Sequence, residues 1–177
     1  ETASKQKEFD YYLWLNDDTI LLAGAFETLL ATAHEVRLKE GRNGIIVGSC
    51  RDPETGEHTY GGRVKRNPLS RLPDQPLPPE NEALPCDTLN GNSVLVPCDI
   101  FCELGNLSRE YIHAFGDVDY GNRAKNKGFF NWICPGHQGL CARNEGIKPW
   151  IDPCVPFSQR WKNFSSPHGL PPRQWYV

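Results

Sequence analysis

One apolar run that ends abruptly at two adjacent carboxylates constrains the fold more than any other feature of this chain. Residues 9–15 are aromatic or aliphatic at nearly every position and show no polar alternation, which is typical of a strand buried on both faces of a mainly parallel sheet. In an open α/β sheet the ligand crevice lies outside the carboxyl ends of such strands. We therefore expect Asn16, Asp17 and Asp18 to project where a ligand can bind.

Two carboxylates in this position suit a hard divalent cation. Mg²⁺ and Mn²⁺ bind to one or two carboxylates and share their other positions between water and phosphate oxygens. A structural interpretation stays open, because Asn and Asp favour turns and an aspartate before an apolar periodic segment is a common helix N-cap. A second acidic cluster, at residues 117–119, favours the metal-site interpretation.

A helix and a second strand are predicted directly after these carboxylates. The helix covers residues 23–36, and Gly41 and Gly44 end the segment. Its apolar residues recur at helical spacing: Phe26, Leu29, Leu30, Ala33 and Val36. The apolar residues 44–49 then predict a strand, so that the first part of the chain is a βαβ unit.

The composition describes one domain. A length of 177 residues, of which 38% are apolar, is enough for a single domain with a sizeable core. The formal net charge of −3 predicts binding neither to nucleic acid nor to an anionic membrane surface. No apolar run approaches the roughly 20 residues that cross a bilayer, so we expect no transmembrane segment. Residues 141–177 lack periodicity and predict an irregular tail.

The start of the chain and its cysteines add two expectations. The chain begins without a signal peptide and contains no methionine, which suggests a fragment or a processed product. Seven cysteines lie at long intervals: Cys50, Cys86, Cys98, Cys102, Cys134, Cys141 and Cys154. No spacing among them matches a zinc ribbon or a CxxC redox motif. We expect free thiols in a reducing cytoplasm, and a disulfide pair stays open as the alternative.

The middle of the chain contains a long loop and an interrupted strand. The proline-rich residues 68–85 predict an excursion outside the sheet, and such loops are often functional lids. Residues 86–97 predict a strand that is interrupted at Asn90 and Gly91. A glycine there would let the backbone approach a ligand, whereas a hairpin turn is the competing interpretation.

Two further helices and a strand are predicted beyond this point. Residues 99–104 predict a short helix that ends at Gly105. Residues 117–127 predict a helix with acidic residues near its start, basic residues near its end and Gly128 just past it, as the helix dipole and a left-handed cap favour. The apolar residues 129–133 predict the strand that follows.

Four segments, taken in this order and spacing, resemble a family 2 glycosyltransferase with the A-type nucleotide-sugar fold. They are residues 13–19 (LWLNDDT), 89–92 (LNGN), 116–124 (GDVDYGNRA) and 136–137 (GH). The similarity extends over about residues 9–140. It implies an α/β fold with a Rossmann-like mixed sheet that is truncated at the amino end, because family members begin with two or three strands and helices that recognise the nucleoside.

The first segment is similar to the DxD element of that family, which binds a divalent metal that bridges the donor diphosphate. The resemblance implies that Asp18 is the principal ligand of Mn²⁺ or Mg²⁺, with Asp17 beside it and Asn16 in the first acidic place. Many relatives have a histidine after the strand that follows the catalytic helix. His137 would therefore complete the metal shell, with a hydrogen-bonded structural histidine as the alternative.

The acidic helix start resembles the Glu-Asp motif of the family, whose aspartate deprotonates the acceptor hydroxyl in an inverting displacement. Asp117 falls in that place, and Gly116 replaces the usual glutamate. A helix N-cap is the alternative role for Asp117, and both roles are compatible. The resemblance also implies that Asp119 and Arg123 contribute to donor or acceptor binding.

The segment around Asn90 and Gly91 resembles the one that lines the donor-sugar and acceptor side. The implied activity is that of a hexosyltransferase of cell-envelope polysaccharide biosynthesis. It moves a sugar from a nucleoside diphosphate to a carbohydrate or lipid-linked acceptor, and it is cytoplasmic or peripheral at the inner face of the membrane. The sheet edge that the absent nucleoside-binding strands would leave exposed predicts self-association.

Two other functions compete with this one. A sugar-1-phosphate nucleotidyltransferase would use a related sheet and metal carboxylates, although the sequence has no glycine-rich phosphate loop. A non-catalytic carbohydrate-binding fragment would depend on aromatic residues such as Trp150, Trp161 and Trp175 and would need neither Asp18 nor Asp117.

Overall fold

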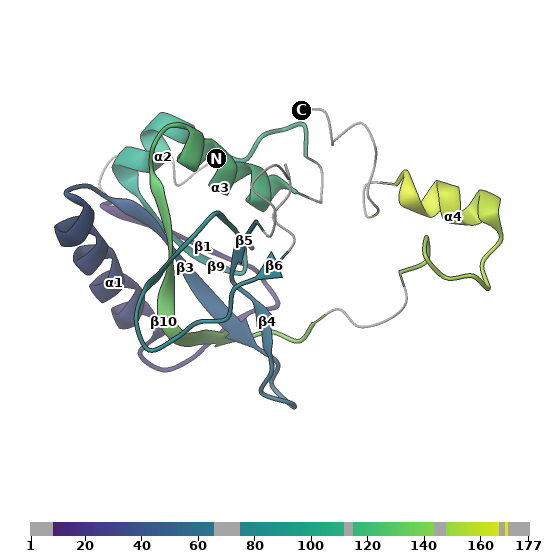
Figure 1. Cartoon of the computed structure of the whole chain (residues 1–177), viewed down its shortest axis with the longest axis horizontal. Coiled ribbons are helices and arrows are strands. Elements are labelled where there is room, and N and C mark those ends of the chain that lie inside the picture. The colour runs from purple at the N-terminus through teal and green to yellow at the C-terminus, as the bar shows by residue number, and fades with distance from the viewer. Residues whose placement is uncertain (1–8, 66–74, 112–114, 144–147, 167–168, 170–177) are drawn as a thin grey trace.

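The computed structural model describes residues 9–65, 75–111, 115–143, 148–166 and 169, and over these the chain is a mixed α/β protein. A curled sheet lies between helices (Figure 1). The described helices are α1 (Ala25–Glu40), α2 (Cys98–Leu104), α3 (Gly116–Asn126) and α4 (Phe157–Phe164). None of them is both long enough and apolar enough to cross a membrane.

The main sheet has the strand order β1-β9-β3-β10-β2, with two short strands beside it. These strands are β1 (Tyr11–Leu15), β9 (Ser93–Pro97), β3 (Gly44–Arg51), β10 (Phe130–Leu140), β2 (Ile20–Leu21), β4 (His58–Tyr60, on β3) and β7 (Leu84–Cys86, on β10). A smaller sheet contains β6 (Gln75–Pro76), β5 (Gly62–Val64) and β8 (Thr88–Leu89). Because β9 is antiparallel to both β1 and β3, and β3 is parallel to β10, three strands end at the same sheet edge.

Several helix and cap predictions are confirmed. The predicted helices at residues 23–36, 99–104 and 117–127 correspond to α1, α2 and α3. Gly105 has a φ of 71° directly after α2, and Gly128 has a φ of 82° after α3. Only glycine adopts such positive φ angles readily, so these residues end their helices for the reason that the sequence suggests.

The prediction that the first strand is buried on both faces is wrong. Within the described sheet β1 is an edge strand that pairs with β9 alone, and the side chains of Leu13 and Leu15 are 37% and 41% exposed. Helix α1 packs mainly on β3 and β10, and on the same face of β1 only Tyr11 contacts its apolar cluster, whereas Leu13 and Leu15 are exposed. The two strands of the predicted βαβ unit, β1 and β3, are not neighbours in the sheet, because β9 lies between them.

Two predictions about irregular segments need correction. The tail at residues 141–177 contains helix α4, so it is not irregular throughout. The predicted excursion at residues 68–85 contains the short strands β6 and β7, while residues 66–74 lie outside the described part of the chain. The predicted interruption at residues 90–91 is confirmed, since β8 and β9 belong to different sheets.

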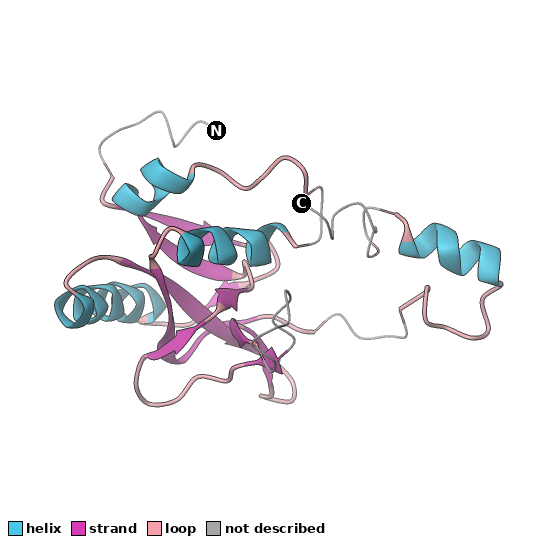
Figure 2. Ribbon diagram, turned by 45° about the horizontal axis from the view of Figure 1, so that its top comes forward, coloured by secondary structure: helices cyan, strands magenta, loops and turns pink. Residues whose placement is uncertain are grey.

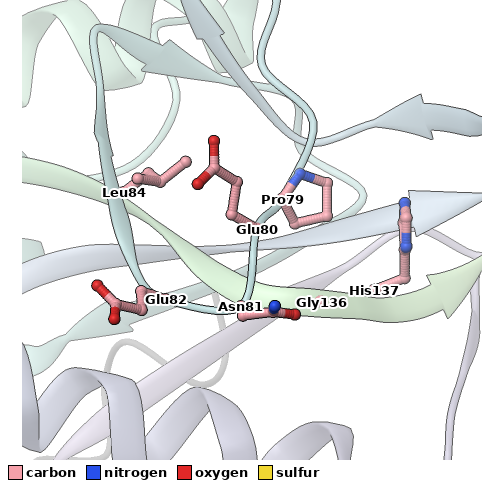
Figure 3. Close-up of a pocket in the computed structure, with 7 residues that line it drawn as sticks. All are labelled: Pro79, Glu80, Asn81, Glu82, Leu84, Gly136 and His137. Carbon is pink, nitrogen blue, oxygen red and sulfur yellow. The ribbon is translucent and has the colours of Figure 1, made fainter.

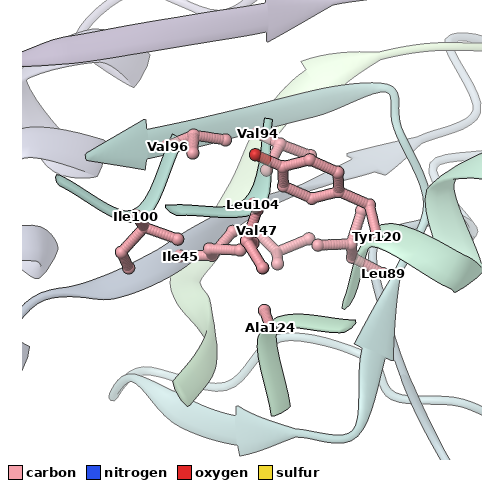
Figure 4. Close-up of a cluster of buried hydrophobic side chains, with 9 residues drawn as sticks. All are labelled: Ile45, Val47, Leu89, Val94, Val96, Ile100, Leu104, Tyr120 and Ala124. Carbon is pink, nitrogen blue, oxygen red and sulfur yellow. The ribbon is translucent and has the colours of Figure 1, made fainter. Parts of the chain in front are cut away.

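The core consists of two apolar clusters, one on each face of the main sheet. Helix α1 contributes Leu29, Ala33 and Val36 to one cluster. Helices α2 and α3 contribute to the other, which contains Ile45, Val47, Leu89, Val94, Val96, Ile100, Leu104, Tyr120 and Ala124 (Figure 4). Figure 2 shows α1 on the opposite side of the sheet from α2 and α3. The fold therefore has a helix, sheet, helix layering.

Helix α3 approaches β8 unusually closely at Gly121. A Cβ atom on Gly121 would lie 2.3 Å from Thr88 Oγ1 and 3.0 Å from Thr88 Cα. The Thr88 hydroxyl donates to the Val118 carbonyl at 2.8 Å, and Asn131 Nδ2 donates to the Gly121 carbonyl at 3.0 Å. These contacts fix the position of α3 and therefore the direction in which its first turn points.

We predict that Gly121→Ala destabilises the protein by roughly 1–3 kcal/mol, the usual cost of overpacking a filled interior. The matched control is Gly116→Ala in the first turn of the same helix, where the nearest side-chain atom would lie 3.5 Å from the new Cβ. There the higher helix propensity of alanine should leave stability unchanged or raise it by up to about 1 kcal/mol. Urea unfolding measures both, and equal effects would contradict the close approach.

Candidate functional site

Two turns meet at the sheet edge where β1 ends. The first, which we call the aspartate turn, contains residues 16–19, and the second, the asparagine turn, contains residues 90–92. The Asn16 amide donates to the Asn92 carbonyl at 3.1 Å. The Asn92 side-chain amide donates to Thr19 Oγ1 at 3.3 Å. Two segments that lie far apart in the sequence, and that were both predicted to bind a ligand, are therefore bonded to each other.

Asp117 joins the asparagine turn to the start of α3. Its Oδ2 accepts a hydrogen bond from the Gly91 amide at 3.1 Å, and its Oδ1 accepts one from the Val118 amide at 2.8 Å. The N-cap of α3 is Phe115, with a φ of 67°, so the N-cap alternative for Asp117 is wrong. Phe115 is the one described residue other than glycine with a positive φ. Such a conformation is uncommon and often occurs near functional sites.

The space beside Gly91 is filled by Trp14 rather than left open for a ligand. A Cβ atom at position 91 would lie 2.7 Å from Cζ2 of the Trp14 indole. Trp14 in turn contacts the Tyr120 ring edge-on, with a centroid distance of 6.0 Å. The glycine is needed for this packing, and the predicted role of Gly91 in ligand approach stays a prediction. Asn90, partly buried, donates its backbone amide to the Gly61 carbonyl at 2.8 Å.

Asp17 and Asp18 are exposed, and Asp18 lies beside two buried cysteines. Burial, together with the smaller effects of the nearby Cys141 and Asp18, raises the pKa of the Cys50 thiol to about 12. Burial also raises the pKa of Cys141, whose sulfur is within hydrogen-bonding reach of Asp18. Both thiols are therefore uncharged at neutral pH. This contact could not be predicted from the sequence, because the two cysteines belong to no spacing motif.

No group of three or more His, Cys, Asp and Glu side chains that could hold a metal is found within the described residues. The two carboxylates of the aspartate turn are the available ligands from the predicted set. Such a pair fits Mg²⁺ or Mn²⁺ only when water and phosphate oxygens supply the other positions. The metal site at Asp17 and Asp18 stays a prediction.

The structure associates His137 with His58 rather than with Asp18. The two imidazole rings have a centroid distance of 5.6 Å. Burial lowers the pKa of His137, and the Arg51 guanidinium lowers it further. Asp18, by contrast, influences Cys50 and Cys141. The role of His137 as a metal ligand is a prediction that these contacts do not support.

A shallow pocket lies next to this histidine pair. It is lined by Pro79, Glu80, Asn81, Glu82, Leu84, Gly136 and His137 (Figure 3). The Gly136 amide donates to the Glu80 carbonyl at 2.8 Å. In Figure 3 the carboxylates of Glu80 and Glu82 point away from His137. The pocket therefore does not add acidic ligands to the histidine pair in this arrangement.

Asp119 and Arg123 contact each other and the end of α2. Arg123 Nε donates to Asp119 Oδ2 at 2.8 Å, one turn apart on α3. The other guanidinium nitrogens donate to the carbonyls of Leu104 and Asn106 at 2.8 and 3.0 Å. These contacts join α3 to the end of α2. The predicted contribution of both residues to donor or acceptor binding stays a prediction.

Comparison with known proteins adds no family to this description. No protein-family model matches the chain, and a search of curated proteins found no match. Any function of this chain must therefore be inferred from the residues of the site themselves.

We predict that the histidine pair makes stability depend on pH. Burial, together with the smaller effects of the nearby His137 and Arg143, lowers the pKa of His58 from 6.5 to about 4. Between these values the unfolded chain binds a proton that the folded protein does not bind at His58. The free energy of unfolding should therefore fall as the pH falls from 6.5 toward 4, and His58 should have no such effect above this range.

Urea unfolding across this pH range measures the effect. His58→Asn should reduce the slope of unfolding free energy against pH, whereas His34→Asn, on the exposed surface of α1, should leave it as in the wild type. A His58→Asn protein with the wild-type slope would contradict the prediction.

Proposed function

We propose that this protein is a metal-dependent, inverting glycosyltransferase that moves a sugar from a nucleoside diphosphate to a carbohydrate or lipid-linked acceptor. One observation carries the proposal. The asparagine turn bonds both to the aspartate turn, through the carbonyl of Asn92, and to Asp117, through the amide of Gly91. A pair of exposed carboxylates and a separately fixed carboxylate therefore occupy one edge of the sheet, where α/β proteins usually bind ligands.

The exposed carboxylates suit the donor side of this reaction. Departure of a nucleoside diphosphate leaves negative charge on a phosphate oxygen, and a bound Mn²⁺ or Mg²⁺ would supply Lewis-acid stabilisation there. Asp18 and Asp17 would bind that cation, and their exposure at the end of β1 leaves room for a diphosphate. Asn16 is fixed against Asn92 and would orient the donor rather than bind the metal.

The fixed carboxylate suits the acceptor side. Asp117 would accept the proton of the acceptor hydroxyl as that oxygen attacks the sugar. Its two amide hydrogen bonds restrict the rotation of the carboxylate. The carboxylate therefore loses little conformational entropy when the acceptor binds. A general base in this position typically contributes about 10²–10⁴-fold to the rate. Asn90, beside it in the asparagine turn, would contact the sugar or the acceptor.

The free edge of β1 supports a further part of the proposal. Among the strands that the structure describes, only β9 pairs with β1, and Leu13 and Leu15 are partly exposed beside the other edge. Another strand, from a nucleoside-binding segment or from a second copy of the chain, would pair there and cover them. The proposed location is the cytoplasm or the inner face of the membrane, where both the donor and a lipid-linked acceptor would be accessible.

We predict that the aspartate turn binds nucleoside diphosphates in a metal-dependent way. Isothermal calorimetry with a panel of nucleoside diphosphates and their sugars should detect binding in the presence of Mn²⁺ and little without it. Asp18→Asn should weaken this binding by about tenfold or more, since even an indirect partner of a metal ligand typically contributes that much. The control is Asp10→Asn, a carboxylate just before the other end of β1.

Equal binding by Asp18→Asn and the wild type would contradict the donor assignment. Nucleotide binding that instead requires a nucleoside triphosphate and a sugar 1-phosphate, with release of pyrophosphate, would favour a nucleotidyltransferase. Binding of sugars alone, unaffected by Asp18→Asn, would favour a carbohydrate-binding protein.

We predict that Asp117→Asn separates binding from chemistry. The amide has nearly the shape of the carboxylate but can accept only one of its two backbone hydrogen bonds. Donor binding should be unchanged, because the proposed metal and diphosphate ligands are Asp17 and Asp18 rather than Asp117. Sugar transfer to the acceptor should fall by about 10²–10⁴-fold, because the amide cannot accept a proton. Asp99→Asn, in the first turn of α2, is the control and should retain full activity. Full activity in Asp117→Asn would exclude this residue as the base.

A further inference from the structure

Helix α4 presents an exposed apolar stripe that the proposed function does not use. The stripe consists of Phe157, Trp161 and Phe164, which recur four and three residues apart and therefore share one face. Phe157 is 76% exposed and Trp161 is 56% exposed, and α4 has no buried residue. The rings of Trp161 and Phe164 stack at a centroid distance of 5.7 Å. Figure 1 shows α4 apart from the sheet and the other helices.

The remaining faces of α4 are polar and carry only positive charge. Helical spacing places Ser158, Gln159, Lys162 and Asn163 away from the stripe. The helix contains no acidic residue. Arg160, at the flank of the stripe, donates from Nε to the Trp150 carbonyl at 3.1 Å, and Lys148 lies over the Trp150 ring. A further aromatic ring and a further cation are therefore next to α4.

The formal charge is distributed unevenly between residues 1–152 and residues 153–177, which contain α4. All 22 acidic residues lie at or before Asp152. Residues 153–177 contain Arg160, Lys162 and Arg173 and no acidic residue. The formal charge is therefore +3 over residues 153–177 and −6 over residues 1–152. The sequence-based expectation of no attraction to an anionic membrane was drawn from the net charge of the whole chain, which does not describe residues 153–177.

We infer that α4 binds at the surface of an anionic lipid bilayer, with its apolar stripe among the upper acyl chains. Helices with tryptophan and phenylalanine on one face and basic residues on the other lie in this interface. Tryptophan is favoured at the level of the headgroups, where one side of the ring is apolar and the other is hydrated. Lys162 and Arg160 would face the lipid phosphates, each strengthening binding by about fivefold.

Charge complementarity favours a bilayer over a protein groove as the partner of α4. The apolar stripe is one residue wide, and the opposite side of the helix is polar and without acidic groups. That pattern suits a boundary between hydrocarbon and water, with an anionic plane between them. This binding needs neither the sugar donor nor a metal, so it can fail or succeed independently of the proposed glycosyltransferase activity.

Flotation with lipid vesicles tests the inference. The full-length protein, without metal or nucleotide, should float with vesicles of phosphatidylcholine and phosphatidylglycerol, and much less with vesicles of phosphatidylcholine alone. Added salt should weaken the binding. Phe157→Glu should reduce it by roughly tenfold or more, because an apolar ring is replaced by a charge. Ser158→Glu is the matched control, since it adds the same charge to the next residue, which is exposed on another face.

Both positions are exposed, so thermal unfolding should show the same stability for the two variants and the wild type. Lys162→Gln should weaken vesicle binding by about fivefold. Three results would overturn the inference: no flotation with anionic vesicles, equal flotation with both kinds of vesicle, or an equal loss in Phe157→Glu and Ser158→Glu. A dimer that dissociates in Phe157→Glu, with no flotation, would instead identify the stripe as an interface between two copies.

Discussion

The candidate site depends on the contact between the Trp14 indole and the backbone of Gly91. The ring lies so close that no side chain fits at position 91. Trp14 also packs edge-on against Tyr120 of α3, which belongs to the larger apolar cluster. One aromatic side chain of β1 therefore touches both the asparagine turn and α3. An apolar contact determines where the polar groups of the site meet, because the Gly91 amide that Trp14 positions is the one that donates to Asp117.

In this arrangement the side chain of Asp117 has less conformational freedom than those of Asp17 and Asp18. Asp117 accepts hydrogen bonds from two backbone amides, so its direction is set before any ligand binds. Asp17 and Asp18 lie on an exposed turn whose backbone is held by the amides of Asn16 and Thr19, and neither carboxylate accepts, from the described residues, a backbone hydrogen bond of the kind that holds Asp117, although Asp18 lies beside Cys141. A fixed carboxylate suits proton transfer, which requires accurate geometry. Carboxylates that can adjust suit a cation whose other ligands arrive with the substrate.

Local signals in the sequence predicted much of the fold, and contacts between distant residues explain what they missed. Helix α3 and its Gly128 cap follow from neighbouring residues, and the structure confirms them. The exposure of Leu13 depends instead on which strands α1 covers, which no local pattern contains. The position of His137 could not be predicted either, because β10 changes register against β3 on both sides of it. Such irregularities change the direction in which the following side chains point, and the alternation of residues along a strand does not predict them.

The charge division of the chain bears on which acceptor the proposed enzyme would use. The net charge of a protein describes every part of its surface only when acidic and basic residues are evenly distributed. In this chain residues 153–177, which contain α4, have no acidic residue. If α4 lies on an anionic bilayer, the negative charge of residues 1–152 opposes close approach of the sheet to the same surface. The sheet would then lie at a short distance from the bilayer rather than in its headgroup region. Of the two proposed acceptor classes, a lipid-linked sugar that extends from the bilayer fits this geometry better than a free carbohydrate, because both partners would diffuse along the same surface.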